Sequence, residues 1–173
     1  MKTNWKKLKF VETHCRIREI DLSYRADIFL RIYALKKDDP AAWKEYKRWI
    51  KFLIDNGRSL SIPTELRRLR QVYASIKGKG YSYPWKDQRD VPIISIYNEN
   101  KFHIFNGASR LSSMMILGID SLMMRVADNV KAHRQEMKII REAYDLDEGA
   151  MMKCLSKEAK DWIREERKQY CDA

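Results

Sequence analysis

The fold is decided by the stretch Lys101–Gly118, which reads KFHIFNGASRLSSMMILG. Its first five residues, 101–105, predict a short strand, and the pair Asn106-Gly107 is typical of tight turns. A helix is predicted to begin at Ala108 or Ser109 and to end at the closing glycine, a residue common at helix ends. The stretch therefore predicts a strand, a tight turn and a helix in direct succession.

The junction between this strand and this helix is suited to binding an anion. A helix N-terminus presents unpaired backbone N–H groups and a partial positive charge, and Gly107 lets a bound group approach the backbone closely. Arg110 in the first turn adds a guanidinium fork, and the Ser109 hydroxyl adds a hydrogen-bond donor. We therefore predict a phosphate-binding turn. Its candidate residues are Asn106, Gly107, Ala108, Ser109, Arg110 and Lys79.

Strands and helices are predicted on both sides of this stretch. Residues 92–97 predict a strand joined to residues 101–105 by a hairpin turn, and residues 121–126 predict a third strand. The other candidate strands are Lys9–Val11 and Arg16–Ile20. The predicted helices are one capped by Asp21 or Ser23 with Ile28, Phe29, Ile32 and Leu35 inward, one from Asp39-Pro40 to Gly57, one from Ser61 to Gly78-Lys79-Gly80, one over 129–144, and a last one carrying Met151 to Ile163.

The length of 173 residues fits one domain with its own hydrophobic core. We predict a single domain over 1–173, with a basic, mainly helical region at 1–62, a core at 63–126 and a pair of helices at 127–173. A hydrophobic content of 45% and a charged content of 34% argue against disorder. No run has the apolar length of a membrane span or of a secretory core, so we expect a cytoplasmic protein without a membrane partner.

The net charge of +11 is concentrated in the first half of the chain. Residues 1–90 hold 22 Lys and Arg against 11 Asp and Glu, whereas residues 91–130 hold 3 against 3 and residues 131–173 hold 10 against 10. A localised basic surface predicts a polyanionic partner such as nucleic acid, although a solvated basic surface needs no partner. The candidates for nucleic-acid contact are Arg67, Arg68 and Arg70, with a solvated helix face as the alternative.

The cysteines argue against a disulfide framework and against a zinc ribbon. Cys15, Cys154 and Cys171 form no C-x-x-C pair, and their odd number leaves one unpaired. His14-Cys15 has no further residue nearby at metal-ligand spacing. We therefore expect free thiols and no protein-bound metal.

The order of these features resembles the ParB/sulfiredoxin superfamily over residues 71–126, about a third of the chain. Members show a Ser-Ile helix end, a Gly and a Pro a few residues later, a strand hairpin, a Gly-x-x-Arg helix start, a Leu-Gly after that helix, and a final strand. The matching residues are Ser75-Ile76, Gly80, Pro84, Gly107, Arg110, Leu117-Gly118 and Met123 to Val126. The resemblance implies an α+β fold with a small mixed β-sheet and a strand–hairpin–helix–strand core. The helices predicted before and after this region are then helical N-terminal and C-terminal additions to that core.

The resemblance also implies that the turn from Gly107 to Arg110 cradles nucleotide phosphates, with ATP or CTP and Mg²⁺ as candidate cofactors. The superfamily includes CTP-binding partition proteins, ATP-dependent sulfiredoxins, free-serine kinases and ParB-like nucleases. This chain departs from them at the turn. Ala108 stands where sulfiredoxins have a cysteine, and Ser109 stands where many members have a histidine. Without the thiol, sulfinic-acid repair is not expected at this position.

Phosphoryl transfer at the turn would need positive charge, positioning and usually a metal held by carboxylates. Lys79 and Arg110 can supply the charge. His103 lies on the strand that leads into the turn and is a candidate general base, with a hydrogen-bonded structural histidine as the alternative. The candidate carboxylates are Glu65, Asp87, Asp90 and Glu99. His103 and Glu65 are therefore the candidate catalytic residues.

Three functions are consistent with these features. The first is a ParB-like domain that binds a nucleoside triphosphate or a nucleic-acid phosphate at Gly107 to Arg110, with phosphotransfer, nucleotide hydrolysis or nuclease activity as candidate reactions. The second is a non-catalytic DNA- or RNA-binding module that uses the basic N-terminal half. The third is a protein-interaction domain in which Asn106 caps the helix and Arg110 pairs with a carboxylate.

Overall fold

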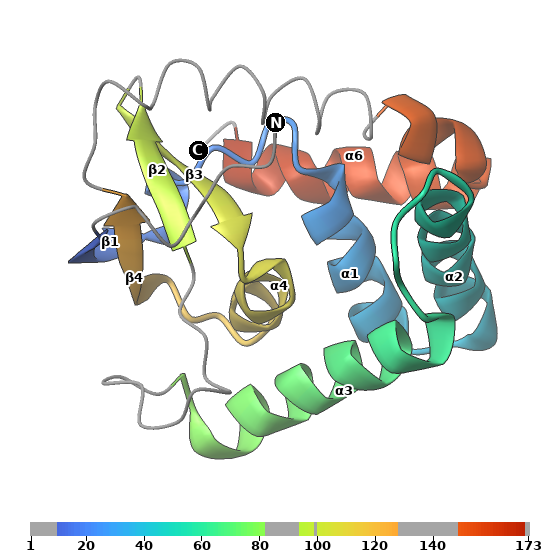
Figure 1. The fold of residues 1–173 in the computed structure, drawn as a ribbon, viewed down its shortest axis with the longest axis horizontal. Coiled ribbons are helices and arrows are strands. Elements are labelled where there is room, and N and C mark those ends of the chain that lie inside the picture. The colour runs from blue at the N-terminus through green and yellow to red at the C-terminus, as the bar shows by residue number, and fades with distance from the viewer. Residues whose placement is uncertain (1–9, 82–93, 99, 128–148, 172–173) are drawn as a thin grey trace.

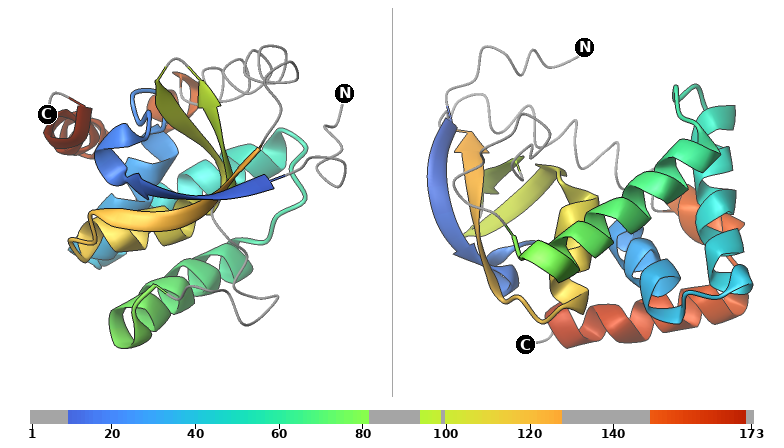
Figure 2. Two further views of the ribbon diagram at one scale, coloured as in Figure 1. Left: turned by 90° about the vertical axis from the view of Figure 1, so that its left-hand side faces the viewer. Right: turned by 90° about the horizontal axis from the view of Figure 1, so that it is seen from below.

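The computed structural model of the chain describes residues 10–81, 94–98, 100–127 and 149–171. These residues form a mixed α+β fold, with a sheet on one side and a group of helices on the other (Figures 1 and 2). The strands are β1 (Phe10–Arg16), β2 (Ile94–Asn98), β3 (Lys101–Asn106) and β4 (Ser121–Ala127). The helices are α1 (Ala26–Lys37), α2 (Pro40–Asp55), α3 (Ile62–Lys79), α4 (Ala108–Ile116) and α6 (Lys157–Cys171), with a short 3-10 helix over Ile17–Glu19.

The sheet has four strands in the order β1-β4-β2-β3. β2 and β3 form an antiparallel hairpin, α4 carries the chain from β3 to β4, and β4 pairs with β2 in parallel. The sheet is therefore mixed, and the predicted α+β class is confirmed. At the hairpin turn Asn100 has a φ of 63°, a left-handed conformation that asparagine tolerates better than most residues.

The N-terminal region contributes an edge strand to this sheet as well as helices. β1 pairs antiparallel with the whole of β4, from Phe10 opposite Ala127 to Arg16 opposite Ser121. The strand is longer than either candidate strand in this region, because its length is set by the partner strand and not by the local apolar pattern. The predicted strand Arg16–Ile20 is wrong, since a 3-10 helix follows Arg16 directly.

The helix starts show where local sequence decides the structure. Asp39 caps α2 as predicted, because its carboxylate accepts a hydrogen bond of 2.8 Å from the backbone N–H of Ala42. The predicted caps of α1 are wrong. Asp21 instead accepts hydrogen bonds from the Ser23 hydroxyl and backbone N–H, at 2.6 and 3.0 Å, and the helix begins after Arg25. The residues predicted to face inward from α1 are buried, namely Ile28, Phe29, Ile32 and Leu35.

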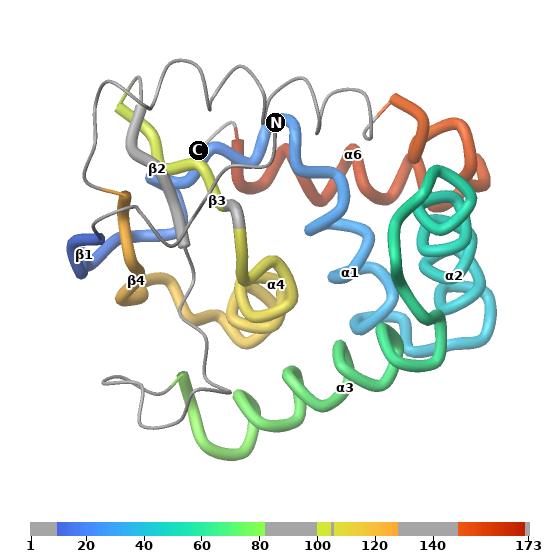
Figure 3. Tube along the Cα trace, in the orientation of Figure 1, coloured from blue at the N-terminus to red at the C-terminus, as the bar shows by residue number. Residues whose placement is uncertain are grey.

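Helix α4 lies between the sheet and the other helices (Figure 3). Its apolar side chains Leu111, Met114 and Met115 are buried in the core. Ser112 and Ser113 are also buried, and their hydroxyls donate to the carbonyls one turn earlier, at 2.8 Å each. The polar groups of the helix are thereby satisfied inside the core. The packing holds α4, and hence its N-terminus, in a fixed position.

The last predicted helix is broken in two. Residues 149–154 are helical, and α6 begins only at Lys157. Ser156 causes the break, since its hydroxyl accepts from the Ala159 N–H at 3.2 Å and its own N–H donates to Glu45 of α2 at 3.0 Å. The predicted helix over 129–144 and the candidate carboxylates Asp87, Asp90 and Glu99 lie outside the described residues. In the described ranges, no helix combines the length and apolar character that crossing a bilayer requires.

Candidate functional site

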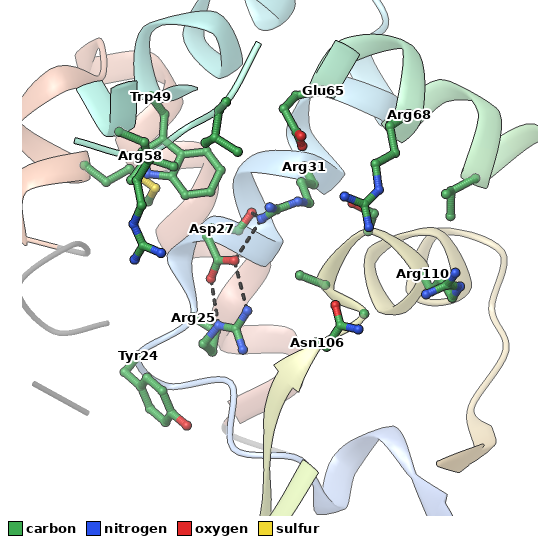
Figure 4. A pocket seen from close by; sticks show the side chains of 17 residues that line it. Tyr24, Arg25, Asp27, Arg31, Trp49, Arg58, Glu65, Arg68, Asn106 and Arg110 are labelled. Carbon is green, nitrogen blue, oxygen red and sulfur yellow. Dashed lines mark hydrogen bonds and ion pairs between the residues drawn. The ribbon is translucent and has the colours of Figure 1, made fainter. Parts of the chain in front are cut away.

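The N-terminus of α4 opens into a pocket of about 250 Å³ between α1, α2, α3 and α4 (Figure 4). Among the described residues, five arginines and two carboxylates line it, so the described cationic side chains outnumber the anionic ones by three. We call it the arginine pocket. Its lining residues are Tyr24, Arg25, Asp27, Arg31, Trp49, Leu53, Arg58, Leu60, Glu65, Arg68, Val72, Asn106, Gly107, Ala108, Ser109, Arg110 and Met151.

The predicted phosphate-binding turn forms one wall of this pocket. Gly107 is the N-cap of α4 with a φ of 100°, a conformation that favours glycine. Its lack of a side chain means that no side-chain cap covers the first-turn N–H groups. Asn106 lines the pocket but does not cap the helix, so the predicted cap is wrong. The helix N-terminus therefore faces the arginines without a side-chain acceptor of its own.

A buried ion-pair network forms the centre of the pocket. The Asp27 carboxylate accepts hydrogen bonds from Arg25 Nε at 2.8 Å, Arg25 Nη2 at 3.0 Å and Arg31 Nη1 at 2.8 Å (Figure 4). Burial alone would raise the pKa of Asp27, but Arg25 and then Arg31 outweigh it and lower the pKa to about 2. Asp27 is therefore ionised at neutral pH, and both of its carboxylate oxygens already accept hydrogen bonds from arginines.

Arg25 also links the helical layer to the sheet. The residue is 1% exposed, and its Nη1 donates to the Ile104 carbonyl of β3, two residues before the turn. A guanidinium has five N–H donors, so one arginine can bind the Asp27 carboxylate and a backbone carbonyl together. This contact fixes the start of α1 against the strand that leads into α4. The two sides of the pocket are thereby held together.

Three further arginines reach the pocket from separate segments. Arg58 follows α2, Arg68 lies on α3, and Arg110 lies in the first turn of α4. Figure 4 shows Arg68 extending from α3 toward α4. Arg68 is exposed and forms no hydrogen bond or ion pair with another residue in the described ranges. A guanidinium in this position can bind a ligand anion without first breaking an internal ion pair.

An apolar wall completes the pocket on the helical side. Its residues are Trp49 and Leu53 of α2, Leu60 from the following loop and Met151, whereas the apolar Val72 lies one helical turn past Arg68 on α3. The Arg31 guanidinium lies over the Trp49 ring, 4.9 Å from its centroid, which fixes the orientation of both side chains. The pocket is thus cationic near α4 and largely apolar at this wall.

The structure separates the predicted site residues into two groups. Residues 106–110, Glu65 and Arg68 line the arginine pocket, whereas Lys79, Arg67, Arg70 and His103 do not. Arg70 stacks on the Trp43 ring at 4.1 Å, and Lys79 is the exposed last residue of α3. The three α3 arginines therefore do not form one ridge, because successive helical positions point in different directions.

His103 is buried behind the pocket, at 1% exposure. Its Nδ1 lies 2.8 Å from the Tyr24 hydroxyl and 3.9 Å from an Asp21 carboxylate oxygen, and its ring stacks on Tyr24 at 5.8 Å. Tyr24 lines the pocket, whereas His103 does not. This arrangement favours the structural role over the general-base role, since the histidine supports a pocket residue and does not reach the pocket itself.

Ten of the 17 described lining residues were not predicted as site residues from the sequence. The only local sign of the ion-pair network is the i, i+4 spacing of Asp27 and Arg31, which is typical of a helical ion pair. Arg25 lies two residues before Asp27. Arg58 and Trp49 gave no signal, because nothing in their neighbourhood places them opposite a turn some fifty residues later.

No family model, curated protein or solved structure matches the chain. The site must therefore be interpreted from its own chemistry. In the described part of the chain, no group of three or more His, Cys, Asp or Glu side chains is placed to hold a metal ion. Cys15 is buried, and burial and then Glu19 raise its pKa to about 12, so this thiol is protonated at neutral pH.

Proposed function

We propose that the arginine pocket binds the phosphate group of a nucleotide or of a nucleic-acid end, within a ParB/sulfiredoxin-like core. The observation that carries this proposal is the convergence of the α4 N-terminus with Arg68 and Arg110 in one concave site. Backbone N–H groups, a helix dipole and guanidinium forks all favour a phosphate oxyanion. The β2–β3–α4–β4 order agrees with the proposed family.

The size of the pocket favours a small ligand over a duplex backbone. Sites for small molecules commonly enclose roughly 300–1,000 Å³, and this pocket, at about 250 Å³, lies just below that range. A pocket of this size takes a mononucleotide-sized group or a terminal phosphate. A nucleoside triphosphate would extend beyond the pocket into solvent.

Among the described carboxylates that line the pocket, Glu65 is the one that phosphoryl chemistry could use. Asp27 is a poor base and a poor metal ligand, because its pKa is about 2 and its oxygens bind Arg25 and Arg31. Glu65 also lines the pocket and forms no ion pair with an arginine in the described ranges. Mg²⁺ usually needs only one or two carboxylates besides ligand phosphates. Glu65 would supply that carboxylate, and the metal would neutralise phosphate charge.

Thermal stabilisation by phosphate-bearing ligands tests the proposal. We expect ATP, CTP, GTP, a nucleoside monophosphate or a 5′-phosphorylated oligonucleotide to raise the Tm of the wild type, by about 2.7 kcal/mol of added stability at a ligand concentration of 100 Kd. Arg110→Ala should remove most of this shift, since its guanidinium lines the pocket beside the α4 N-terminus. The measurement is a melting curve for each ligand with and without Mg²⁺.

Arg67→Ala is the matched control, because Arg67 lies on α3 beside Arg68 but outside the pocket lining. It should leave every ligand-induced shift unchanged. The proposal fails if no ligand shifts the wild type, or if Arg67→Ala and Arg110→Ala reduce the shifts equally. The second result would indicate binding to the general basic surface.

A further inference from the structure

The apolar wall of the arginine pocket contains a buried hydrogen-bond donor. Trp49 is 7% exposed, and its Nε1 is buried without a hydrogen-bond partner among the described residues. A buried donor left unsatisfied costs about 1–3 kcal/mol, and such groups are rare in native structures. The indole that carries this donor lines the same pocket as the α4 N-terminus.

The surroundings of Trp49 differ chemically from the α4 side. Leu53, Leu60 and Met151 provide apolar surface, whereas the phosphate-binding turn and Arg110 provide hydrogen-bond donors. Figure 4 shows Trp49 on the opposite side of the Arg25–Asp27–Arg31 network from Arg110. A ligand that fills the pocket therefore meets the donors of α4 at one end. At the other end it meets apolar side chains, the Arg31 guanidinium that lies over the Trp49 ring, and one buried N–H.

We infer that the Trp49 wall is a second subsite, which binds the organic part of the phosphate ester. This inference rests on the proposed function. The chemical class that fits is a nucleoside monophosphate, because a heteroaromatic base offers flat apolar surface and a ring nitrogen or carbonyl that accepts a hydrogen bond from Trp49 Nε1. A sugar phosphate lacks the flat apolar surface, and inorganic phosphate lacks the organic part altogether.

Access to the Trp49 donor requires a side chain to move, because Nε1 has almost no solvent contact. Met151 and Arg58 line the pocket and have long, flexible side chains that can change rotamer. The free-energy cost of this side-chain movement is offset when the ligand accepts a hydrogen bond from the indole N–H. Discrimination between ligands then depends on the acceptor that the ligand carries.

Titration calorimetry with four probes tests this subsite. The probes are inorganic phosphate, ribose 5-phosphate, AMP and CMP. We expect the wild type to bind AMP or CMP at least about tenfold more tightly than phosphate or ribose 5-phosphate. Trp49→Phe keeps an aromatic ring but removes the donor, so it should weaken nucleotide binding about fivefold, the worth of roughly 1 kcal/mol, and leave phosphate binding unchanged.

Two further variants make the result decisive. Trp162→Phe removes an indole of α6 outside the pocket and should change no affinity. Leu60→Ser changes an apolar pocket residue that is 37% exposed, so it should fold normally and weaken nucleotide binding alone. The second subsite would be overturned if the wild type bound AMP, CMP and phosphate with equal affinity. It would also be overturned if Trp49→Phe and Leu60→Ser weakened nucleotide and phosphate binding equally. Either result would leave the phosphate site standing. If none of the four probes bound, the proposed function itself would be overturned.

Discussion

Asp27→Asn should lower the free energy of unfolding by about 3–5 kcal/mol, the usual loss when one partner of a buried ion pair is removed. The substitution keeps the shape of the side chain but removes its charge. Arg25, at 1% exposure, would then be a buried cation without its carboxylate, and Arg31 would lose the same partner. The measurement is equilibrium unfolding in urea at neutral pH.

Asp55→Asn provides the matched control for this variant. Asp55 pairs with Lys51 at 3.2 Å, but both side chains are more than half exposed. Exposed pairs contribute about 0–1 kcal/mol, so this variant should have nearly wild-type stability. A loss of less than about 1 kcal/mol for Asp27→Asn would contradict a central role of the network.

Acidification gives a second readout of the same network. The pKa of Asp27 is about 2 in the folded chain against 3.8 for a free side chain, so the folded state binds this proton less readily than the unfolded state. The stabilisation from ionised Asp27, about 2 kcal/mol, is therefore complete above pH 4 and is lost as the pH falls toward 2. In Asp27→Asn this part of the acid dependence should be absent.

Arg68→Ala combined with Arg110→Ala should weaken phosphate binding at least about 100-fold. Hydrogen bonds to charged groups contribute about 1.5–3 kcal/mol each, so each arginine accounts for roughly a tenfold to hundredfold change. The two side chains come from α3 and α4 and line the same pocket. The measurement is the Kd for a nucleoside monophosphate, determined at fixed salt concentration.

Arg67→Ala combined with Lys79→Ala removes the same number of positive charges from α3 without changing the pocket lining. This control should alter the Kd by less than about threefold, because Arg67 and Lys79 are exposed to solvent and neither lines the pocket. Similar losses in both double variants would show that net charge, and not the pocket, determines binding. Circular dichroism would verify that each variant remains folded.

The elements around the phosphate-binding turn could be predicted because their signals are local. The run ending at Phe105, the Asn106-Gly107 pair and the apolar spacing of α4 each act over a few residues. β1 was predicted only in part, because its extent depends on pairing with β4, more than a hundred residues away. The break at Ser156 was missed for a related reason, since Glu45 of α2 binds its backbone N–H.

The residues of the candidate site likewise fall into those with a local sequence signal and those placed only by tertiary contacts. The donors of the 106–110 turn were predicted from one short stretch, whereas the opposing arginines required the tertiary fold. Arg25 reaches the carbonyl of Ile104, 79 residues later, and that contact brings Asp27 and Arg31 to the turn. The sequence could not separate Arg68 from its neighbours Arg67 and Arg70, because only the fold shows that Arg68 lines the pocket while Arg70 lies over the Trp43 ring.

The location of a bound phosphate tests the central claim most directly. A crystal structure of the chain with a nucleoside monophosphate should place the phosphate at the N-terminus of α4, with its oxygens about 2.7–3.1 Å from first-turn backbone N–H groups and from the Arg110 or Arg68 guanidinium. Both arginines already line the pocket into which that N-terminus opens. A phosphate bound outside the arginine pocket, or an empty pocket at saturating ligand, would contradict the claim.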